Sequence, residues 1–84
     1  GEGFMAWEFA DKEKKEALVS IVITDKEPND AQRYLRLKGL KRDAKYRVEG
    51  LDLILSGQAL LKAGIPVPRE LHEYDSVQHH LTEQ

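Results

Sequence analysis

Two acidic residues near the end of the chain come closest to a pattern that could do chemistry. Glu73 and Asp75 are two residues apart, so on an extended strand their side chains project from the same face. Two carboxyl groups about 5–5.5 Å apart can divide the roles of nucleophile and proton donor in a hydrolytic reaction. Neither residue lies in an apolar segment of the kind that activates a catalytic carboxyl group. We therefore interpret both as solvated residues on either side of Tyr74 and expect no catalytic residue in this chain.

The histidines His72, His79 and His80 are the candidates for a metal site. Adjacent residues of a strand point to opposite faces, so His79 and His80 cannot readily bind one metal ion. His72 and His79 differ by an odd number of positions and would diverge in the same way if one strand held both. No cysteine or carboxylate partner stands at ligand spacing beside them. We expect surface or interdomain histidines, no metal site and no cofactor.

Aromatic side chains could form a platform for a sugar, because an aromatic ring can stack on the apolar face of a sugar ring. In a chain this small, aromatic residues also supply much of the core. Packing in the core or against another domain explains Trp7 better than a sugar site does, whereas both interpretations stay open for Tyr74. Trp7 and Tyr74 are therefore the candidates for substrate binding. The other aromatic residues considered are Tyr34 and Tyr46.

The charge balance argues against a nucleic-acid partner. Thirteen basic and fifteen acidic residues give a net charge of −2, whereas nucleic-acid-binding domains usually carry a basic excess. A basic cluster in residues 38–47 is offset by Asp43, Glu49 and the acidic loops, so we interpret it as a solvated turn. The cluster consists of Lys38, Lys41, Arg42, Lys45 and Arg47.

The length of 84 residues fits one domain, residues 1–84, with a modest core. Its apolar runs fall far short of the ~20 residues of a membrane helix, so no membrane partner is expected. The start, Gly1–Phe4, lacks the basic and apolar regions of a signal peptide and is interpreted as a cut inside a longer chain. Cysteine is absent, which is compatible with a reducing compartment. The expected location is cytoplasmic.

Short segments with alternating apolar and polar residues predict a protein built mainly of strands. Turn-forming residues such as Pro28–Asp30 separate them, and the charged segment Asp11–Glu16 is interpreted as the solvated connection of a hairpin. The segment Ala17–Thr24 is apolar on both faces, which favours a place near the middle of a sheet. We expect Leu53–Leu55 to be a short buried strand. The predicted strands are Phe4–Phe9, Ala17–Thr24, Tyr34–Lys38, Lys45–Glu49, Leu53–Leu55 and Tyr74–Leu81.

One segment changes to a helical pattern. Ser56 can cap the first turn of a helix over about residues 57–63, and Gly64 stands where a left-handed C-terminal cap would fall. A helix of under two turns must be held by packing, here through Leu60 and Leu61. The predicted fold is all-β, a small antiparallel β-sandwich with one short helix.

With these elements placed, the chain resembles the C-terminal domain of glycoside hydrolase family 36, the bacterial α-galactosidases or melibiases. Four segments carry the resemblance in the order and spacing of the family and span nearly the whole chain. They are the aromatic strand around Trp7 with its charged hairpin and Ala17–Thr24; Leu35–Leu40 followed by Tyr46–Val48; Ser56–Leu60 leading to Gly64–Pro68; and Asp75–Ser76 ahead of His79–Leu81. The chain departs from the family at Leu55–Ser56 and Gln58, where an aromatic and an acidic residue commonly flank the glycine that is Gly57 here.

The resemblance implies an accessory domain of a larger multidomain glycosidase, in which an N-terminal β-domain and a (β/α)8 barrel precede the β-sandwich. The barrel of such an enzyme hydrolyses terminal α-galactosides such as melibiose and raffinose with retention, using two carboxylates. No position here matches the barrel motifs, and barrel chemistry resides on the loops that follow barrel strands. We therefore expect an α-galactosidase of carbohydrate metabolism as the parent protein and no enzymatic activity in this chain alone.

The expected partner is the catalytic barrel of the same chain, with a homo-oligomer as a further partner to consider. Separated from its barrel, the sandwich is expected to expose an apolar patch and to self-associate at high concentration. Two alternatives come from other classes of protein. One is a carbohydrate-binding module that holds galactosides through Tyr74 or Trp7, and the other is a free-standing, non-enzymatic interaction domain.

Overall fold

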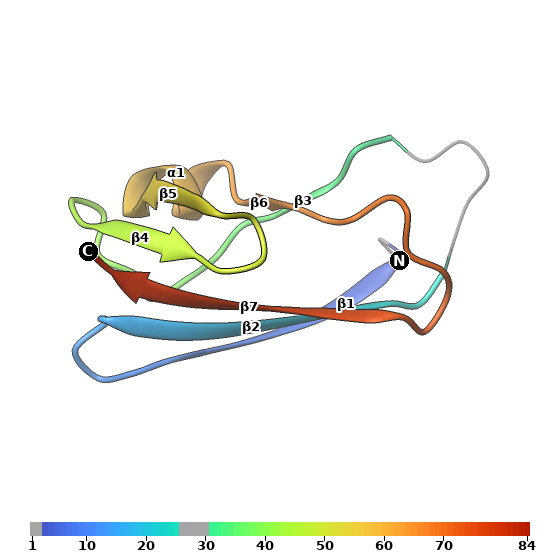
Figure 1. Ribbon diagram of the computed structural model, residues 1–84, viewed down its shortest axis with the longest axis horizontal. Helices are drawn as coiled ribbons and strands as arrows, with labels where there is room; N and C mark the ends of the chain where they lie inside the picture. Colours follow the sequence, from blue (N-terminus) through green and yellow to red (C-terminus); the bar gives the residue numbers. More distant parts are fainter. Residues whose placement is uncertain (1–2, 26–30) are drawn as a thin grey trace.

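The computed structural model describes residues 3–25 and 31–84, which form two layers (Figure 1). The larger sheet is antiparallel and five-stranded, with the strand order β1-β2-β7-β4-β5, and it curls so that β4 and β5 lie beside the smaller layer (Figure 1). That smaller layer holds the two-stranded sheet β3-β6 and the helix α1. This arrangement confirms the predicted β-sandwich with one short helix. The predicted turn Pro28–Asp30 lies outside the described residues. The elements are β1 (Phe4–Ala10), β2 (Glu16–Ile23), β3 (Tyr34–Leu35), β4 (Lys45–Val48), β5 (Leu53–Ser56), α1 (Gly57–Lys62), β6 (Ile65–Pro66) and β7 (Ser76–Glu83).

The predicted hairpin with a charged connection is confirmed in β1 and β2, whose ends pair Phe4 with Ile23 and Ala10 with Ala17. Asp11 closes the turn, because its Oδ1 accepts hydrogen bonds from the backbone N–H groups of Lys15 at 2.7 Å and Glu16 at 3.2 Å. The charged side chains of this turn are exposed, so the segment shapes the hairpin without contributing to the core.

The core lies between the two layers and follows the alternation along each strand. Tyr46 and Val48 of β4 point inward and are fully buried, in keeping with their alternation with Lys45, Arg47 and Glu49 along the chain. β2 lies between β1 and β7, which confirms its expected place inside a sheet. The buried apolar residues are Ala17, Val19, Ile21, Ile23, Leu37, Leu40, Tyr46, Val48, Leu60, Ile65, Val67 and Leu81.

The helix is capped and packed as predicted. The side chain of Ser56 accepts a hydrogen bond from the backbone N–H of Ala59 at 3.0 Å, and Gly64 has a left-handed backbone with a φ of +90°. Leu60 is fully buried and Leu61 packs against the core. In the described residues no helix is long and apolar enough to cross a membrane.

Three predicted strands differ from the structure. The strand predicted over Tyr34–Lys38 is shorter, since β3 covers only Tyr34–Leu35. Leu53 and Ile54 are each 51% exposed, so the expectation of a buried strand is wrong: β5 is an edge strand that pairs only with β4. The last strand begins at Ser76 instead of Tyr74, because Tyr74 has a left-handed φ of +68° that ends an extended segment. Its N–H donates to the carbonyl oxygen of Ile23 at 2.6 Å.

Candidate functional site

The two carboxylates first considered for chemistry lie in the loop before β7. The expectation that a strand holds Glu73 and Asp75 with parallel side chains is wrong, because the left-handed residue Tyr74 stands between them. Asp75 Oδ2 instead accepts a hydrogen bond from the backbone N–H of His72 at 2.9 Å and lies 3.5 Å from His72 Nδ1. Asp75 therefore closes a local turn, and the two carboxylates are both exposed.

The histidines of β7 point to opposite faces of the sheet, as predicted. His80 lies on the outer face, where its Nε2 is 3.0 Å from Glu16 Oε1. His79 is only 2% exposed, so its interpretation as a surface or interdomain residue is wrong. Within residues 3–25 and 31–84, no three residues of metal-binding type come together.

His79 has a structural role at the turn between β4 and β5. Its Nδ1 is 2.8 Å from the carbonyl oxygen of Glu49, so a neutral ring donates from Nδ1 and leaves Nε2 without a proton. The Nε2 atom is shielded from solvent and has no hydrogen-bond partner. Gly50 makes room for the ring, because a Cβ atom at this position would lie 2.7 Å from His79 Nδ1. His79 thus ties the central strand to this turn.

Glu8 is a half-buried polar residue that the sequence reasoning missed. It lies opposite Val19, which in turn pairs with His79, so all three side chains share the inner face of the sheet. Its Oε1 accepts a hydrogen bond from the backbone N–H of Lys38 at 2.8 Å, and its Oε2 is buried without a partner. Burial raises the pKa of Glu8, although the hydrogen bond from Lys38 partly opposes this. Glu8 is an odd number of positions from Met5, so strand alternation places its side chain on the face opposite to that of Met5. This spacing is the pattern in the sequence that could have identified it.

Replacing Glu8 with glutamine is expected to remove a pH dependence of stability. The pKa of Glu8 in the folded chain lies above its ordinary value of 4.5, so the folded state binds the proton more tightly than the unfolded state. This contribution to the free energy of unfolding is fully present below pH 4.5 and decreases as the pH rises through the raised pKa. Glu8→Gln lacks the decrease and should gain stability relative to the native chain as the pH is raised.

Urea denaturation of both proteins at a series of pH values from about 4 to 7 measures this difference. The control is Glu73→Gln, which neutralises an exposed carboxylate and should follow the native curve. A Glu8→Gln curve parallel to the native one would show that burial of Glu8 has no influence on its titration.

The four aromatic residues do not form one platform. Tyr46 is fully buried, whereas Tyr34 is 57% exposed on the layer opposite Trp7. Tyr74 is 77% exposed in the loop before β7. Trp7 lies on the outer face of the sheet and is 47% exposed, so a place in the core is wrong for it. Packing against another domain and a sugar site both stay open as predictions for Trp7.

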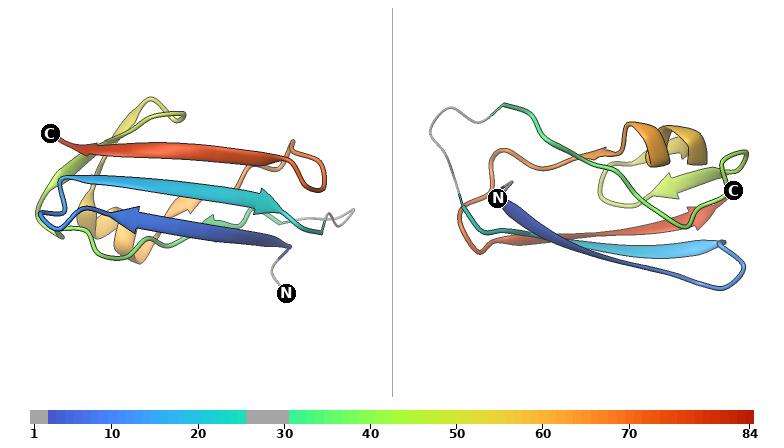
Figure 2. Two further views of the ribbon diagram at one scale, coloured as in Figure 1. Left: turned by 90° about the horizontal axis from the view of Figure 1, so that it is seen from below. Right: turned by 180° about the vertical axis from the view of Figure 1, so that it is seen from behind.

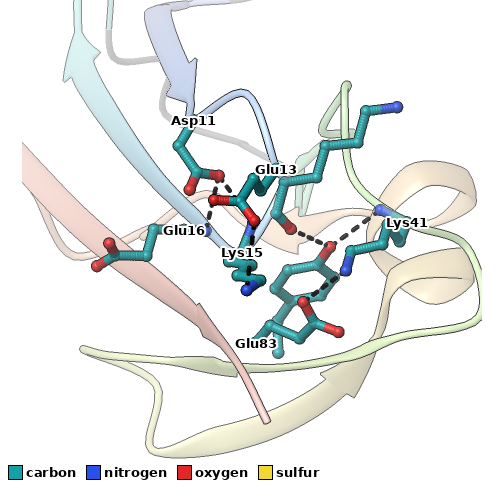
Figure 3. A network of polar contacts seen from close by, with 8 residues as sticks. Asp11, Glu13, Lys15, Glu16, Lys41 and Glu83 are labelled. Atoms are coloured by element: carbon teal, nitrogen blue, oxygen red, sulfur yellow. Dashed lines mark hydrogen bonds and ion pairs between the residues drawn. The ribbon is translucent and has the colours of Figure 1, made fainter.

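A polar network joins the hairpin turn to the end of β7 (Figure 3). The hydroxyl of Tyr46 donates to the carbonyl oxygen of Lys14 at 2.8 Å and accepts from the backbone N–H of Lys41 at 2.9 Å. Lys41 Nζ is 2.7 Å from Glu83 Oε1, and this hydrogen bond raises the pKa of the Lys41 ammonium group. The network links the hairpin turn, β4, β7 and the loop before β4 at one end of the molecule.

The basic cluster borders an open hollow of about 450 Å³ at the start of α1. Arg42 and Lys45 line it together with Asp43, and these side chains are exposed. This agrees with a solvated turn. The first N–H groups of the helix are already bonded, since Gly57 donates to the carbonyl oxygen of Ala44 at 2.8 Å and Gln58 to that of Arg42 at 3.0 Å.

Residues 4–81 match the sequence profile of the glycosyl hydrolase family 36 C-terminal domain. The chain belongs to this family. The bifunctional alpha-galactosidase/sucrose kinase AgaSK of Mediterraneibacter gnavus is 45% identical over 78 residues, which are 93% of this chain and 8% of the relative. The alpha-galactosidase AgaA of Geobacillus stearothermophilus is 36% identical over 72 residues, which are 86% of this chain and 10% of the relative.

Solved structures agree with this membership. The galactosidase domain of AgaSK superposes with a TM-score of 0.91 at 43% identity, covering 98% of this chain and 11% of that chain. The family 36 α-galactosidase AgaB of Geobacillus stearothermophilus superposes with a TM-score of 0.88 at 33% identity, again over 98% of this chain and 11% of the other. The family 36 C-terminal domain thus spans about a tenth of each of these relatives.

Proposed function

We propose that this chain is the accessory C-terminal domain of an α-galactosidase and that it packs against the catalytic barrel of the same polypeptide. The superposition on the galactosidase domain of AgaSK, over 98% of this chain at 43% identity, carries the proposal. The substrates of the parent enzyme would be terminal α-galactosides such as melibiose and raffinose. A variant of the relative AgaA has been solved in complex with raffinose. The cytoplasmic location stays a prediction.

Several polar groups of this domain hold structural contacts within it, which supports an accessory role. Glu8 accepts a hydrogen bond from the backbone of Lys38, and Tyr46 bridges Lys14 and Lys41. Such groups hold elements of the domain in place and leave the chemistry to the barrel. A retaining mechanism would use two carboxylates of the barrel on either side of the glycosidic bond.

Hydrolysis of a chromogenic α-galactoside by the complete polypeptide and by the 84-residue chain tests the proposal. The complete polypeptide should turn over the substrate and the chain alone should not. Glu73→Gln and Asp75→Asn in the complete polypeptide should retain kcat/KM within about twofold, because neither residue would contact substrate. Turnover by the chain alone that is lost in either variant would overturn the proposal.

A carbohydrate-binding module is the second candidate function, and one observation favours it. Tyr74 is 77% exposed and has a left-handed φ of +68°, and strained backbone is often found at functional positions. Titration of the chain with galactose, melibiose and raffinose, followed by NMR, tests this alternative. Saturable shifts at Tyr74 or Trp7 would favour the module, and unchanged spectra would favour the accessory role.

The third candidate is a free-standing interaction domain. The reading frame upstream of this segment distinguishes it from the accessory domain and from the carbohydrate-binding module. Several hundred residues with alternating strands and helices would contradict it. An upstream frame without such a region would instead favour the free-standing domain over an accessory one.

A further inference from the structure

The outer face of the five-stranded sheet is uncovered in the part of the chain that the structure describes. In Figure 1 the smaller layer lies on one side of β1, β2 and β7, and the view from below in Figure 2 shows the three strands side by side with no element in front of them. Four large apolar side chains lie on this face. They are Met5, Trp7, Phe9 and Leu18, which are 53%, 47%, 72% and 41% exposed, and we call them the apolar face.

The pairing register makes the apolar face continuous. Phe9 lies directly opposite Leu18, and Met5 lies opposite Val22, with Trp7 between Met5 and Phe9 on β1. Directly opposed side chains on adjacent strands touch one another. The neighbouring strand β7 differs, because its outward residues are polar. They are Ser76, Gln78, His80 and Thr82.

An apolar centre beside a polar margin is the composition of a protein–protein interface. Trp, Met and Phe are enriched at the centre of such interfaces, where a few large side chains provide most of the affinity. A sugar site would instead need several polar groups that converge on the ligand. On β2 the residue directly opposite Trp7 is Ser20, and it is the one polar group that this strand places beside the ring. The chemistry of the apolar face therefore fits a protein surface better than a sugar.

We propose that the apolar face docks onto the domain that precedes this one in the same polypeptide. The inference rests on the proposed function, since it takes the chain to be part of a longer enzyme. The family is a C-terminal domain, and the chain covers only 8–11% of AgaSK and AgaB. In those relatives most of the polypeptide therefore lies outside the matched part, and the family's description as a C-terminal domain places polypeptide ahead of it.

The position of β1 identifies the occupant. The family match begins at residue 4, the first residue of β1, so polypeptide that precedes the C-terminal domain enters it through the strand that carries Met5, Trp7 and Phe9. A short covalent connection gives two surfaces a high effective concentration and favours their contact over contact between separate molecules. The preceding domain should present an apolar patch of its own to this strand.

Thiol labelling of single cysteine variants tests the docking surface. The chain contains no cysteine, so Phe9→Cys places one thiol on the apolar face, and Tyr34→Cys places a matched thiol at a 57% exposed position on the opposite layer. Both variants are made in the 84-residue chain and in the complete polypeptide. The labelling rate of each site by a maleimide is followed by peptide mass spectrometry, and circular dichroism confirms folding.

In dilute 84-residue chain both sites should react at similar rates. In the complete polypeptide the Phe9→Cys site should react at least about tenfold more slowly, independently of protein concentration, while the Tyr34→Cys site stays fast. Equal rates at the two sites of the complete polypeptide would overturn the docking surface. Protection that grows with concentration would also overturn it, because a second copy of the chain would then be the occupant.

α-Galactosidase activity of the same preparations separates this inference from the proposed function. An active enzyme with an unprotected Phe9→Cys site would overturn the docking surface and leave the function standing. A protected Phe9→Cys site in a polypeptide without α-galactosidase activity would overturn the proposed function and leave the docking surface standing. A separate Leu18→Cys variant places a thiol on β2 within the same apolar face. Its labelling in the complete polypeptide should be slowed as much as that of the Phe9→Cys site.

Discussion

Replacing Gly57 with alanine is expected to lower the free energy of unfolding by about 3–5 kcal/mol. A Cβ atom at this position would lie 1.8 Å from the carbonyl oxygen of Lys41 and 2.8 Å from its carbonyl carbon. Because these are backbone atoms, the loop around Lys41 would have to move away from the helix. The hydrogen bonds from Gly57 to Ala44 and from Gln58 to Arg42 would be lost with it.

Chemical denaturation of Gly57→Ala beside Gly39→Ala measures the effect of this close approach. Gly39 has a left-handed φ of +68°, but a Cβ atom there would meet nothing nearer than the Ala10 Cβ at 4.0 Å. Its substitution should therefore cost only about 1–2 kcal/mol of backbone strain. Equal losses in the two variants would mean that the helix can move away from the loop without loss of packing.

Replacing Tyr46 is expected to have the second large effect. Its ring is fully buried, and its hydroxyl satisfies the carbonyl of Lys14 and the N–H of Lys41. Tyr46→Ala should cost about 3–5 kcal/mol, as for other large aromatic residues in cores. Tyr46→Phe keeps the ring and should cost about 1–3 kcal/mol, because it leaves two polar backbone groups without their partner.

The comparison of the two Tyr46 variants separates packing from hydrogen bonding. Tyr34→Phe serves as the control, because Tyr34 is 57% exposed and loss of its hydroxyl should change stability by no more than about 0.5 kcal/mol. A domain of this length has a total stability of about 4–13 kcal/mol, so Tyr46→Ala removes a large part of it. If Tyr46→Phe were as stable as the native chain, the bridge between Lys14 and Lys41 would not contribute to stability.

Local chemistry in the sequence was enough to predict several elements. Ser56 and Gly64 define the ends of the short helix through contacts with their neighbours in the chain. Alternation placed Tyr46 and Val48 on one face of β4, and both are buried. The charged residues 11–16 predicted a hairpin connection because they have nothing apolar to bury. The four family motifs carried the identification, and no single one of them is specific.

Other features depend on contacts between residues far apart in the chain. The strand order places β7 between β2 and β4, and nothing local to Ser76–Glu83 specifies these neighbours. Leu53 and Ile54 have the composition of a buried strand but lie at an edge of the sheet. His79 and His80 were known to diverge, yet only the pairing of β7 decides that His79 enters the core.

The chemistry considered first shows the same division. The sequence by itself predicted no catalytic pair, and its alternation puts Met5, Trp7 and Phe9 on one side of a strand and Glu8 on the other. Only the tertiary structure decided that Glu8 faces the core and Trp7 faces outward. The physical reason is that strand alternation defines which side chains share a face of the sheet. Which of the two faces becomes the core depends on the side against which the second layer packs.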